Sequence, residues 1–409
     1  MQTSSCHSSR FYSTDDTEGD HYDSRSASFS SLPSLPKVRT LTSHPNQQNH
    51  LSSTLSHCLT TLTGHSSYIF SLTLAGKFLY TGSSDNEIRL WKRNPHSYED
   101  DDEIIANNVV AVGKGAVKSL VVLANQLFTA HQDCKIRVWK IKTQDPHKNI
   151  KYEKIATLPT LGDRTVKLLN PNNQVEIRRH KKCTWVHHVD TVSALALSRD
   201  QSLLYSVSWD RTLKVWQTSD FKCLESIKNA HDDAINAVAV SYDGDVYTGS
   251  ADKKIKVWKK LPGDKRHTLV NTLEKHNSGI NALALSPDGF LLYSGACDRS
   301  ILVWEKSSHD DSMELLGALR GHTKAILCLA AVDDLVFSGS ADKTVRVWRR
   351  VGRNYSCLTV LEGHQGPVKC LTAAADAYCP HDSTSFSSYL LYSGSLDCDI
   401  RVWQVLVSK

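Results

Sequence analysis

Apolar and polar residues alternate with a period of two in seven short segments of the chain, which predicts seven half-buried β-strands. Each segment reads apolar-basic-apolar-Trp, except the fifth, in which Leu302 replaces the basic residue. The basic residues share a strand face with the Trp, so we expect their aliphatic stems to pack there rather than form a binding stripe. They are Arg89, Arg137, Lys214, Lys256, Arg346 and Arg401.

Three further polar residues recur at fixed distances from this Trp and define a repeat. An Asp stands six residues before each Trp, a Ser or Thr stands four residues before that Asp, and a His lies upstream in six of the seven repeats. The six complete sets are His65, Thr81, Asp85, Trp91; His188, Ser206, Asp210, Trp216; His231, Thr248, Asp252, Trp258; His276, Ser294, Asp298, Trp304; His322, Ser338, Asp342, Trp348; and His364, Ser393, Asp397, Trp403.

The second repeat departs from this pattern. It supplies Thr129, Asp133 and Trp139 but reads Gly113-Lys114 where Gly-His is expected. We therefore expect an incomplete set of hydrogen bonds and a softer unit at this point of the chain.

The recurring residues suit a structural hydrogen-bond network better than catalysis. A Trp buried in a sheet needs an acceptor for its N–H, and a carboxylate held against an imidazole satisfies both groups. Seven copies argue against one active site, and no nucleophile, metal or phosphate-loop motif stands outside them. We expect no catalytic residue, no cofactor and no metal. A zinc site at His180, Cys183, His187 and His188 is not expected, because His188 already belongs to a repeat set.

The repeat resembles the WD40 repeat, whose units are four-stranded blades of a β-propeller. It extends over residues 57–405. The resemblance implies an all-β, seven-bladed β-propeller in which His, Ser/Thr, Asp and Trp are linked across each blade. The residue after the repeat Trp is never Asp. The Trp-Asp-x-Arg element by which some members bind a ubiquitin-ligase adaptor is therefore absent.

The two ends of the repeat region are expected to meet. After Trp403 only six residues remain, too few for another outer strand. The segment Cys58-Leu-Thr-Thr-Leu62 matches Cys357-Leu-Thr-Val-Leu361, which precedes the His of the last repeat. We expect the N-terminal segment to complete the last blade and close the ring, which leaves no open sheet edge.

Residues 1–56 differ in composition from the repeats that occupy residues 57–409. They contain 15 Ser and few large apolar residues, which predicts a disordered tail. Arg25-Ser-Ala-Ser28 resembles a basophilic kinase site, so Ser28 is a candidate phosphorylation site. The chain has no apolar run long enough for a membrane span and no signal-like N-terminus. We expect no membrane association and a location in the cytoplasm, the nucleus or both.

A basic insertion of about residues 141–182 separates repeats two and three, and a short polar insertion of about residues 376–388 lies in repeat seven. Residues 140–182 carry eleven Lys or Arg and four acids, whereas the whole chain has a net charge of only +5. The densest basic positions are Arg178, Arg179, Lys181 and Lys182. A solvated loop, a patch for an acidic partner or nuclear import, and nucleic-acid binding all remain open.

One position of the repeat indicates a partner site. In the WD40 family, partners often use the face that carries the turns with the repeat Asp, and the residue before each Asp borders that face. This residue is Trp209 in the third repeat and smaller elsewhere: Ser84, Gln132, Ala251, Cys297, Ala341 and Leu396. The residue after the Asp is basic in four successive repeats: Arg211, Lys253, Arg299 and Lys343. A generic turn preference and a site for an acidic or phosphorylated peptide both explain these basic residues.

The insertion also resembles that of the plant JINGUBANG-type WD-repeat group. The similar segments of the insertion are Ala156-Thr-Leu-Pro-Thr-Leu-Gly-Asp-Arg164 and Glu176-Ile-Arg-Arg-His-Lys-Lys182. The opening of the first repeat, Leu62-Thr-Gly-His-Ser-Ser-Tyr-Ile69, is similar too. Membership implies a non-enzymatic regulator of plant signalling or development that binds signalling or transcriptional proteins. We expect a monomeric propeller that works within complexes. The alternative is a component of a nucleic-acid or ribonucleoprotein complex that uses the basic insertion.

Overall fold

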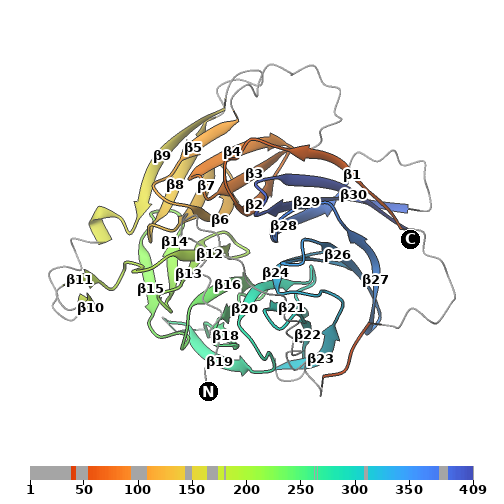
Figure 1. The fold of residues 1–409 in the computed structure, drawn as a ribbon. Helices are drawn as coiled ribbons and strands as arrows, with labels where there is room; N and C mark the ends of the chain where they lie inside the picture. The colour runs from red at the N-terminus through yellow and green to blue at the C-terminus, as the bar shows by residue number, and fades with distance from the viewer. Residues whose placement is uncertain are drawn as a thin grey trace, which may run out of the picture.

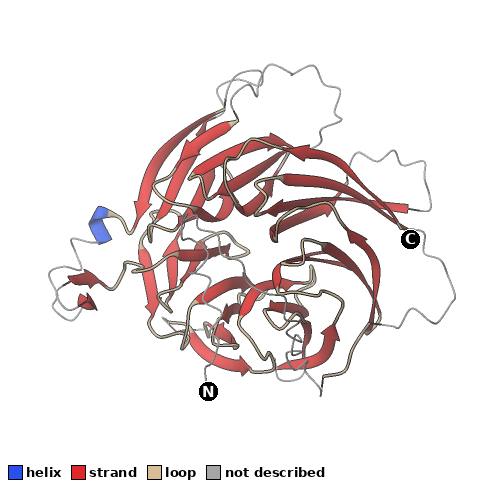
Figure 2. Ribbon diagram, viewed as in Figure 1, coloured by secondary structure: helices blue, strands red, loops and turns tan. Residues whose placement is uncertain are grey.

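The computed structural model describes residues 38–42, 54–93, 108–142, 150–163, 174–178, 181–261, 263–264, 266–307, 312–376 and 386–408. Strands dominate these ranges, and one helical turn covers residues 161–163 (Figure 2). Within them, no helix is long and apolar enough to span a bilayer.

Seven four-stranded antiparallel sheets stand as blades around a ring, which confirms the predicted propeller (Figure 1). We label the strands of each blade a to d from the centre outwards. The blades are, in order, β2 (Ile69–Ala75), β3 (Phe78–Ser83), β4 (Glu87–Lys92), β5 (Val109–Val112); β6 (Val117–Leu123), β7 (Gln126–His131), β8 (Ile136–Lys142), β9 (Lys151–Leu158); β12 (Val192–Leu197), β13 (Leu203–Ser208), β14 (Leu213–Gln217), β15 (Cys223–Ile227); β16 (Ile235–Val240), β17 (Val246–Ser250), β18 (Ile255–Lys259), β19 (Thr268–Leu273); β20 (Ile280–Leu285), β21 (Leu291–Ala296), β22 (Ile301–Lys306), β23 (Met313–Leu319); β24 (Ile326–Val332), β25 (Leu335–Ser340), β26 (Val345–Val351), β27 (Asn354–Leu361); and β28 (Val368–Ala375), β29 (Phe386–Ser395), β30 (Ile400–Ser408), β1 (Leu55–Leu62).

The apolar core lies between adjacent blades. Every strand a begins with an Ile or Val that is fully buried, and these residues pack against strands b and c of the preceding blade. In one such layer Tyr205 and Val207 of blade three contact Ile235 and Trp258 of blade four. At several joints the blades approach so closely that strand b carries Gly: a Cβ on Gly295 would lie 2.5 Å from Cγ2 of Ile326. Stability therefore depends on neighbouring blades being present.

The ring closes through the N-terminal strand, as the sequence predicts. Strand β1 pairs antiparallel with β30, with Leu62 opposite Ile400 and Leu55 opposite Leu406. Strand β2 of blade one contacts β28 of blade seven, so the inner strands also form a closed circle. β1 is the d strand of blade seven, and the strand begins at Leu55, two residues before the expected limit of the repeats.

Two stretches outside the repeats differ from the sequence-based expectation. Residues 38–42, inside the predicted disordered tail, pack against blades five and six because Leu41 is buried there. The basic stretch 141–182 is not a single insertion, since β9 within it is the d strand of blade two. Only the part after β9 leaves the blade, and it contains a hairpin of β10 (Gln174–Arg178) and β11 (Lys181–Thr184).

Some sequence-based expectations concern positions outside the described residues. Ser28 and Arg179 are among them, as is most of the insertion in repeat seven. The two ends of that insertion are described and joined: the amide of Asp376 donates to the carbonyl of Ser388 at 2.9 Å.

Candidate functional site

The predicted network of His, Ser/Thr, Asp and Trp has the same geometry in six blades. In blade four, Nε2 of His231 lies 2.8 Å from Oγ1 of Thr248, and Nδ1 lies 2.8 Å from a carboxylate oxygen of Asp252. The indole N–H of Trp258 donates to the same Thr248 oxygen at 2.9 Å. The Asp also accepts backbone N–H groups on both sides of the turn, so every polar group of the network is satisfied inside the blade.

The second blade rebuilds part of this network with a different histidine: the bonds of Thr129 are kept, and only the expected loss of the His–Asp bond is confirmed. Nε2 of His131, at the end of strand b, lies 2.7 Å from Oγ1 of Thr129, which also accepts the Trp139 indole N–H at 3.0 Å. Nδ1 of the same ring donates to the carbonyl of Gly115 at 3.0 Å. The His131 imidazole therefore contacts the usual hydroxyl, although it comes from a different position in the repeat.

The sequence-based alignment places Lys114 at the position of the missing histidine, but the structure places Gly113 there. Gly113 stands four residues before the first residue of strand a, as the repeat histidines do in the other six blades. A Cβ on Gly113 would lie 2.5 Å from Cε1 of His131, so glycine makes room for the substitute ring. The freed Asp133 forms an ion pair with Arg137 instead, at 2.5 Å.

Burial and hydrogen bonding fix the protonation of these networks. Burial opposes ionisation of the repeat Asp residues, but hydrogen bonds from histidine and the backbone outweigh it, so the pKa of Asp85 and of Asp252 is lowered. Burial lowers the pKa of His131 to about 4, against a smaller opposing effect of its hydrogen bond to Gly115. His131 is therefore neutral at pH 7.

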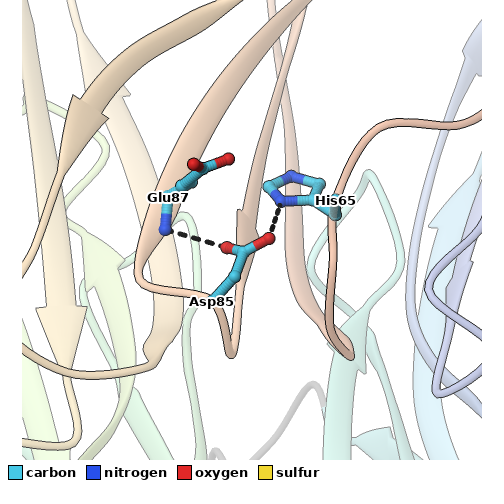
Figure 3. Close-up of side chains that lie close together, drawn as sticks. All are labelled: His65, Asp85 and Glu87. Carbon is cyan, nitrogen blue, oxygen red and sulfur yellow. Dashed lines mark hydrogen bonds and ion pairs between the residues drawn. The ribbon is translucent and has the colours of Figure 1, made fainter.

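His65, Asp85 and Glu87 bring three metal-binding side chains within 4.8 Å of one another (Figure 3). Other contacts account for this group. Asp85 bridges Nδ1 of His65 at 2.8 Å and the amide of Glu87 at 2.9 Å, as its counterparts do in other blades. The Glu87 carboxylate forms an ion pair with Arg89 at 2.7 Å. The arrangement is that of a structural turn.

The basic residues of strand c use their charged heads as well as their stems. Nζ of Lys214 donates to the carbonyl of Trp185 at 2.7 Å and to Oγ of Ser226 at 2.6 Å. Nζ of Lys256 donates to the carbonyl of Ala230 at 2.7 Å. The hydrogen bonds to the two carbonyls link strand c to the segment that precedes strand a of the same blade. His188 is likewise engaged through both ring nitrogens, with Ser206 and Asp210.

The turns between strands b and c lie beside the beginnings of the strands a, on one face of the ring. In every blade the residue before the repeat Asp donates its backbone N–H to the residue preceding strand a. Trp209 does so to Thr191 at 3.1 Å, and its half-buried side chain borders this face. We call this face the b–c face.

Beside Trp209 the b–c face carries a lysine that the sequence reading missed. Nζ of Lys118, the second residue of β6, lies 3.6 Å from the centre of the Phe70 ring and 5.7 Å from that of Trp209. Within the described chain, no carboxylate or hydrogen-bond acceptor pairs with this ammonium. Burial, reinforced by the charge of Lys369, lowers the pKa of Lys118 to about 7.

The second position of strand a distinguishes two parts of the ring. In blades three to five the side chain at this position donates a hydrogen bond to a backbone carbonyl of the next blade. Asn236 donates to Ile280 at 2.9 Å, and Asn281 donates to Ile326 at 2.8 Å. The side chains of Phe70, Lys118 and Lys369, at the same position in blades one, two and seven, form no such bond in the described chain. A comparison of this one position across the repeats could have found Lys118.

The four basic residues after the repeat Asp occupy the same backbone conformation. Arg211, Lys253, Arg299 and Lys343 have φ between 68° and 72°. So do Asn86 and Cys398, at 71° and 72°, which shows that the turn itself imposes this conformation. None of the four basic side chains has an ion pair or hydrogen bond to another described residue. Their charges are free for a ligand, although none of the four contacts Trp209 through an ion pair, a hydrogen bond or a cation–π interaction in the described chain.

Among the described residues, neither two surface depressions nor two carboxylates of the b–c face form a competing site. Two shallow depressions, of about 400 Å³ and 200 Å³, lie at the a–b turns, one beside Gly76 and the other beside Tyr242 and Gly289. Two carboxylates on the b–c face accept backbone N–H groups: Asp190 accepts the amide of Thr191, and Asp233 that of Ala234.

Three of the predicted basic positions of the insertion, Arg178, Lys181 and Lys182, lie on the β10–β11 hairpin, which projects from the ring (Figure 1). Arg178 pairs in register with Lys181, and Lys182 with Glu176, along the backbone. The hairpin stands apart from the blades and does not include Trp209 or Lys118.

Known proteins share this architecture. The family profile "WD domain, G-beta repeat" matches residues 56–92, 180–217, 221–259, 267–305, 313–349 and 355–404, more than half of the chain. The matches omit the second blade, whose histidine is displaced. The WD40 β-propeller domain of Doa1 superimposes with a TM-score of 0.60 and 19% identity over 85% of this chain and 96% of that domain, a likeness of fold alone.

Several relatives are similar in sequence. The small ribosomal subunit protein RACK1 of Drosophila melanogaster is 28% identical over 54% of this chain and 53% of its own length. Autophagy-related protein 16 of Arabidopsis thaliana is 24% identical over 64% of this chain and 53% of its own. A ribosome biogenesis protein WDR12 homolog of Trichoplax adhaerens is 22% identical over 84% and 74%. The chain spans about half the length of the first two relatives. It belongs to the WD40-repeat family.

Proposed function

We propose that the protein is a non-enzymatic scaffold that binds an acidic or phosphorylated segment of a partner protein on its b–c face. The observation that carries this proposal is Lys118, an ammonium held between the rings of Phe70 and Trp209 with no acidic partner in the described chain. A partly buried, unpaired cation is costly, and an anionic ligand would supply the missing charge.

The surroundings of Lys118 support a peptide rather than a small molecule. Trp209 offers a half-exposed aromatic ring, a residue type enriched where binding energy is concentrated. Arg211, Lys253 and Lys343 are exposed on successive blades, and Arg299 is half-exposed between them. Such charges would attract an acidic segment and orient it before close contact forms.

The relatives support a role in assembly. They are named for a ribosomal subunit, for autophagy and for ribosome biogenesis. Within this role we propose membership of the plant JINGUBANG-type group, on the insertion segments quoted above. We also propose that the protein acts as a monomeric propeller in the cytoplasm, the nucleus or both, as a regulator of plant signalling or development.

Fluorescence anisotropy with labelled acidic peptides, with and without phosphoserine, tests the b–c face. We expect Trp209→Ala to weaken binding by about tenfold or more, the loss typical of a central aromatic contact. Replacing Arg211, Lys253, Arg299 and Lys343 together by Asn should slow association and weaken the dependence on salt. Asn suits this turn, because Asn86 occupies the same position in blade one.

A charge-matched variant provides the control. Lys77, Lys222, Lys260 and Arg353 are exposed at the a–b and c–d turns, on the opposite face of the ring. Their replacement by Asn removes the same charge and should leave peptide affinity within about twofold. Equal losses in both fourfold variants would show general charge attraction and would contradict a site on the b–c face.

A component of a nucleic-acid or ribonucleoprotein complex is the second candidate, favoured by the projecting β10–β11 hairpin. Its basic positions Arg178, Lys181 and Lys182 stand outside the blades. Binding to a labelled RNA should then weaken steeply with salt, and replacing Arg178, Arg179, Lys181 and Lys182 by Ala should reduce the slope of log affinity against log salt. An unchanged slope would reject this function.

A further inference from the structure

Residues 38–42 lie across the outer edges of blades five and six, far in sequence from both (Figure 1). The amide of Ala318 donates to the carbonyl of Arg39, and the amide of Leu41 donates to the carbonyl of Ala318, both at 2.9 Å. The amide of Tyr355 donates to the carbonyl of Leu41 at 3.1 Å. One short segment thus bonds to the edge of β23 and to the edge of β27.

The side chains of this segment divide into buried and exposed positions. Leu41 is only 4% exposed and belongs to a core cluster with Tyr293, Leu319 and Tyr355. Val38 packs against the neighbouring cluster of blades four and five. Arg39 and Thr40 point to solvent. The segment therefore binds as an extended Val-x-x-Leu motif anchored by its leucine.

The receiving surface has a feature that the other blades lack. Gly317 of β23 stands opposite Val303, and a Cβ there would lie 2.5 Å from the carbonyl oxygen of Arg39 and 2.7 Å from Cγ of Leu41. The residues opposite the equivalent valines carry side chains in five other blades: Ala156, Glu225, Asn271, Thr359 and Thr60. The absent side chain leaves space for the bound segment.

We infer that the joint between β23 and β27 is a binding slot for an extended segment with the Val-x-x-Leu pattern, occupied in this chain by its own residues 38–42. The slot offers what strand-addition sites offer: backbone groups on a sheet edge for affinity and an apolar pocket for one side chain. It is separate from the b–c face, since it lies on the outer d strands.

Residues 38–42 compete with any partner protein for the slot. A segment of the same chain competes at an effective concentration of about 1 mM. A partner protein therefore reaches the slot only if it presents a similar apolar pattern with higher affinity or if the tail is removed from the slot. The slot is a second interaction surface whose access the tail controls.

The full chain with Leu41→Asp tests this inference, because the substitution removes the anchor and changes no residue of the blades. The probe is a fluorescein-labelled peptide of residues 36–44. We expect it to bind this variant about tenfold or more tightly than the wild-type chain, whose slot is occupied. The same peptide with Asp in place of Leu41 should not bind, and adding Gly317→Thr to the variant should abolish binding. Because Gly317 has a φ of 157°, thermal unfolding must show that the ring stays folded in this variant before its loss of binding is interpreted.

Hydrogen exchange at Ala318 and Tyr355 gives a readout that does not depend on affinity. Both amides donate to the segment, so they should exchange faster in Leu41→Asp and regain protection when the peptide is added. Equal peptide binding by wild type and variant, or unchanged exchange at both amides, would overturn the inference. Protection that rises with protein concentration would also overturn it, since the occupant would then come from a second copy.

Discussion

At the scale of single residues, the second blade shows that a hydrogen-bond network can be conserved in space while its residues change. Gly113 stands where the other six blades have histidine, and His131 ends strand b, where five other blades have serine and blade five has Ala296. The Thr129 hydroxyl keeps both of its partners. Sequence alone could place Thr129, Asp133 and Trp139 by their spacing. It could not place His131, because the substitution depends on a space that Gly113 leaves in three dimensions.

The exchange can be reversed by two substitutions. His131→Ser alone should lower the free energy of unfolding by about 1–3 kcal/mol, since Thr129 loses a buried partner. Gly113→His alone should cost a similar amount, because its side chain meets the ring of His131. Together they recreate the arrangement of the other blades and should restore most of the stability. Urea denaturation of the four proteins measures this coupling, and a double variant as unstable as the sum of the single ones would refute the assignment.

His131 also predicts a dependence of stability on pH. Its pKa falls from 6.5 to about 4 on folding, so the unfolded chain binds the proton more tightly and stability decreases as pH falls below 6.5. Between pH 7 and pH 5 this group should cost the wild type about 2 kcal/mol that His131→Ser does not lose. The lowered pKa values of the repeat Asp residues act only below about 3.8 and do not contribute in this range. Stability curves that stay parallel at both pH values would contradict a buried neutral His131.

At the scale of secondary-structure elements, strand β1 is expected to contribute more to the stability of the ring than its length suggests, because it closes the ring. The match between Cys58–Leu62 and Cys357–Leu361 was enough to predict it. The segment 38–42 could not be predicted in the same way, since one leucine among Thr and Ser residues gives no periodic signal. Its position depends on Gly317, which is distant in sequence.

Substitutions of two leucines of β1 distinguish the contribution of ring closure to stability from a general effect of adding a charge to the surface. Leu62 packs on the core between blades seven and one, whereas Leu55, on the same strand, is 60% exposed. Leu62→Asp should lower stability by about 3 kcal/mol or more, because it places a charge beside apolar side chains. Leu55→Asp should change it by about 0.5 kcal/mol or less. Thermal unfolding followed by tryptophan fluorescence, with size-exclusion chromatography for self-association through the freed β30 edge, distinguishes them. Equal effects would contradict closure by β1.

At the scale of the whole molecule, the repeats make the ring nearly symmetric, and the departures from symmetry indicate function. The spacing of Asp and Trp determined the blades and the turns, so Trp209 and the basic turn residues could be placed from sequence. A comparison of the second residue of strand a across the repeats could single out Lys118, but it could not show that the ammonium is partly buried and lacks an acidic partner in the described chain. Its environment arises only when blades one, two, three and seven bring Phe70, Trp209 and Lys369 around it.

The affinity of a glutamate-rich peptide at pH 6 and pH 8 tests the central claim most directly. With its N-terminus acetylated, the peptide carries the same charge at both values, whereas Lys118, with a pKa of about 7, is mostly charged at pH 6 and mostly neutral at pH 8. If Lys118 receives the anionic group, the wild type should bind about tenfold more tightly at pH 6, and Lys118→Met should lose this difference. Equal affinity of the wild type at both pH values, or a difference that persists in Lys118→Met, would contradict the proposed site.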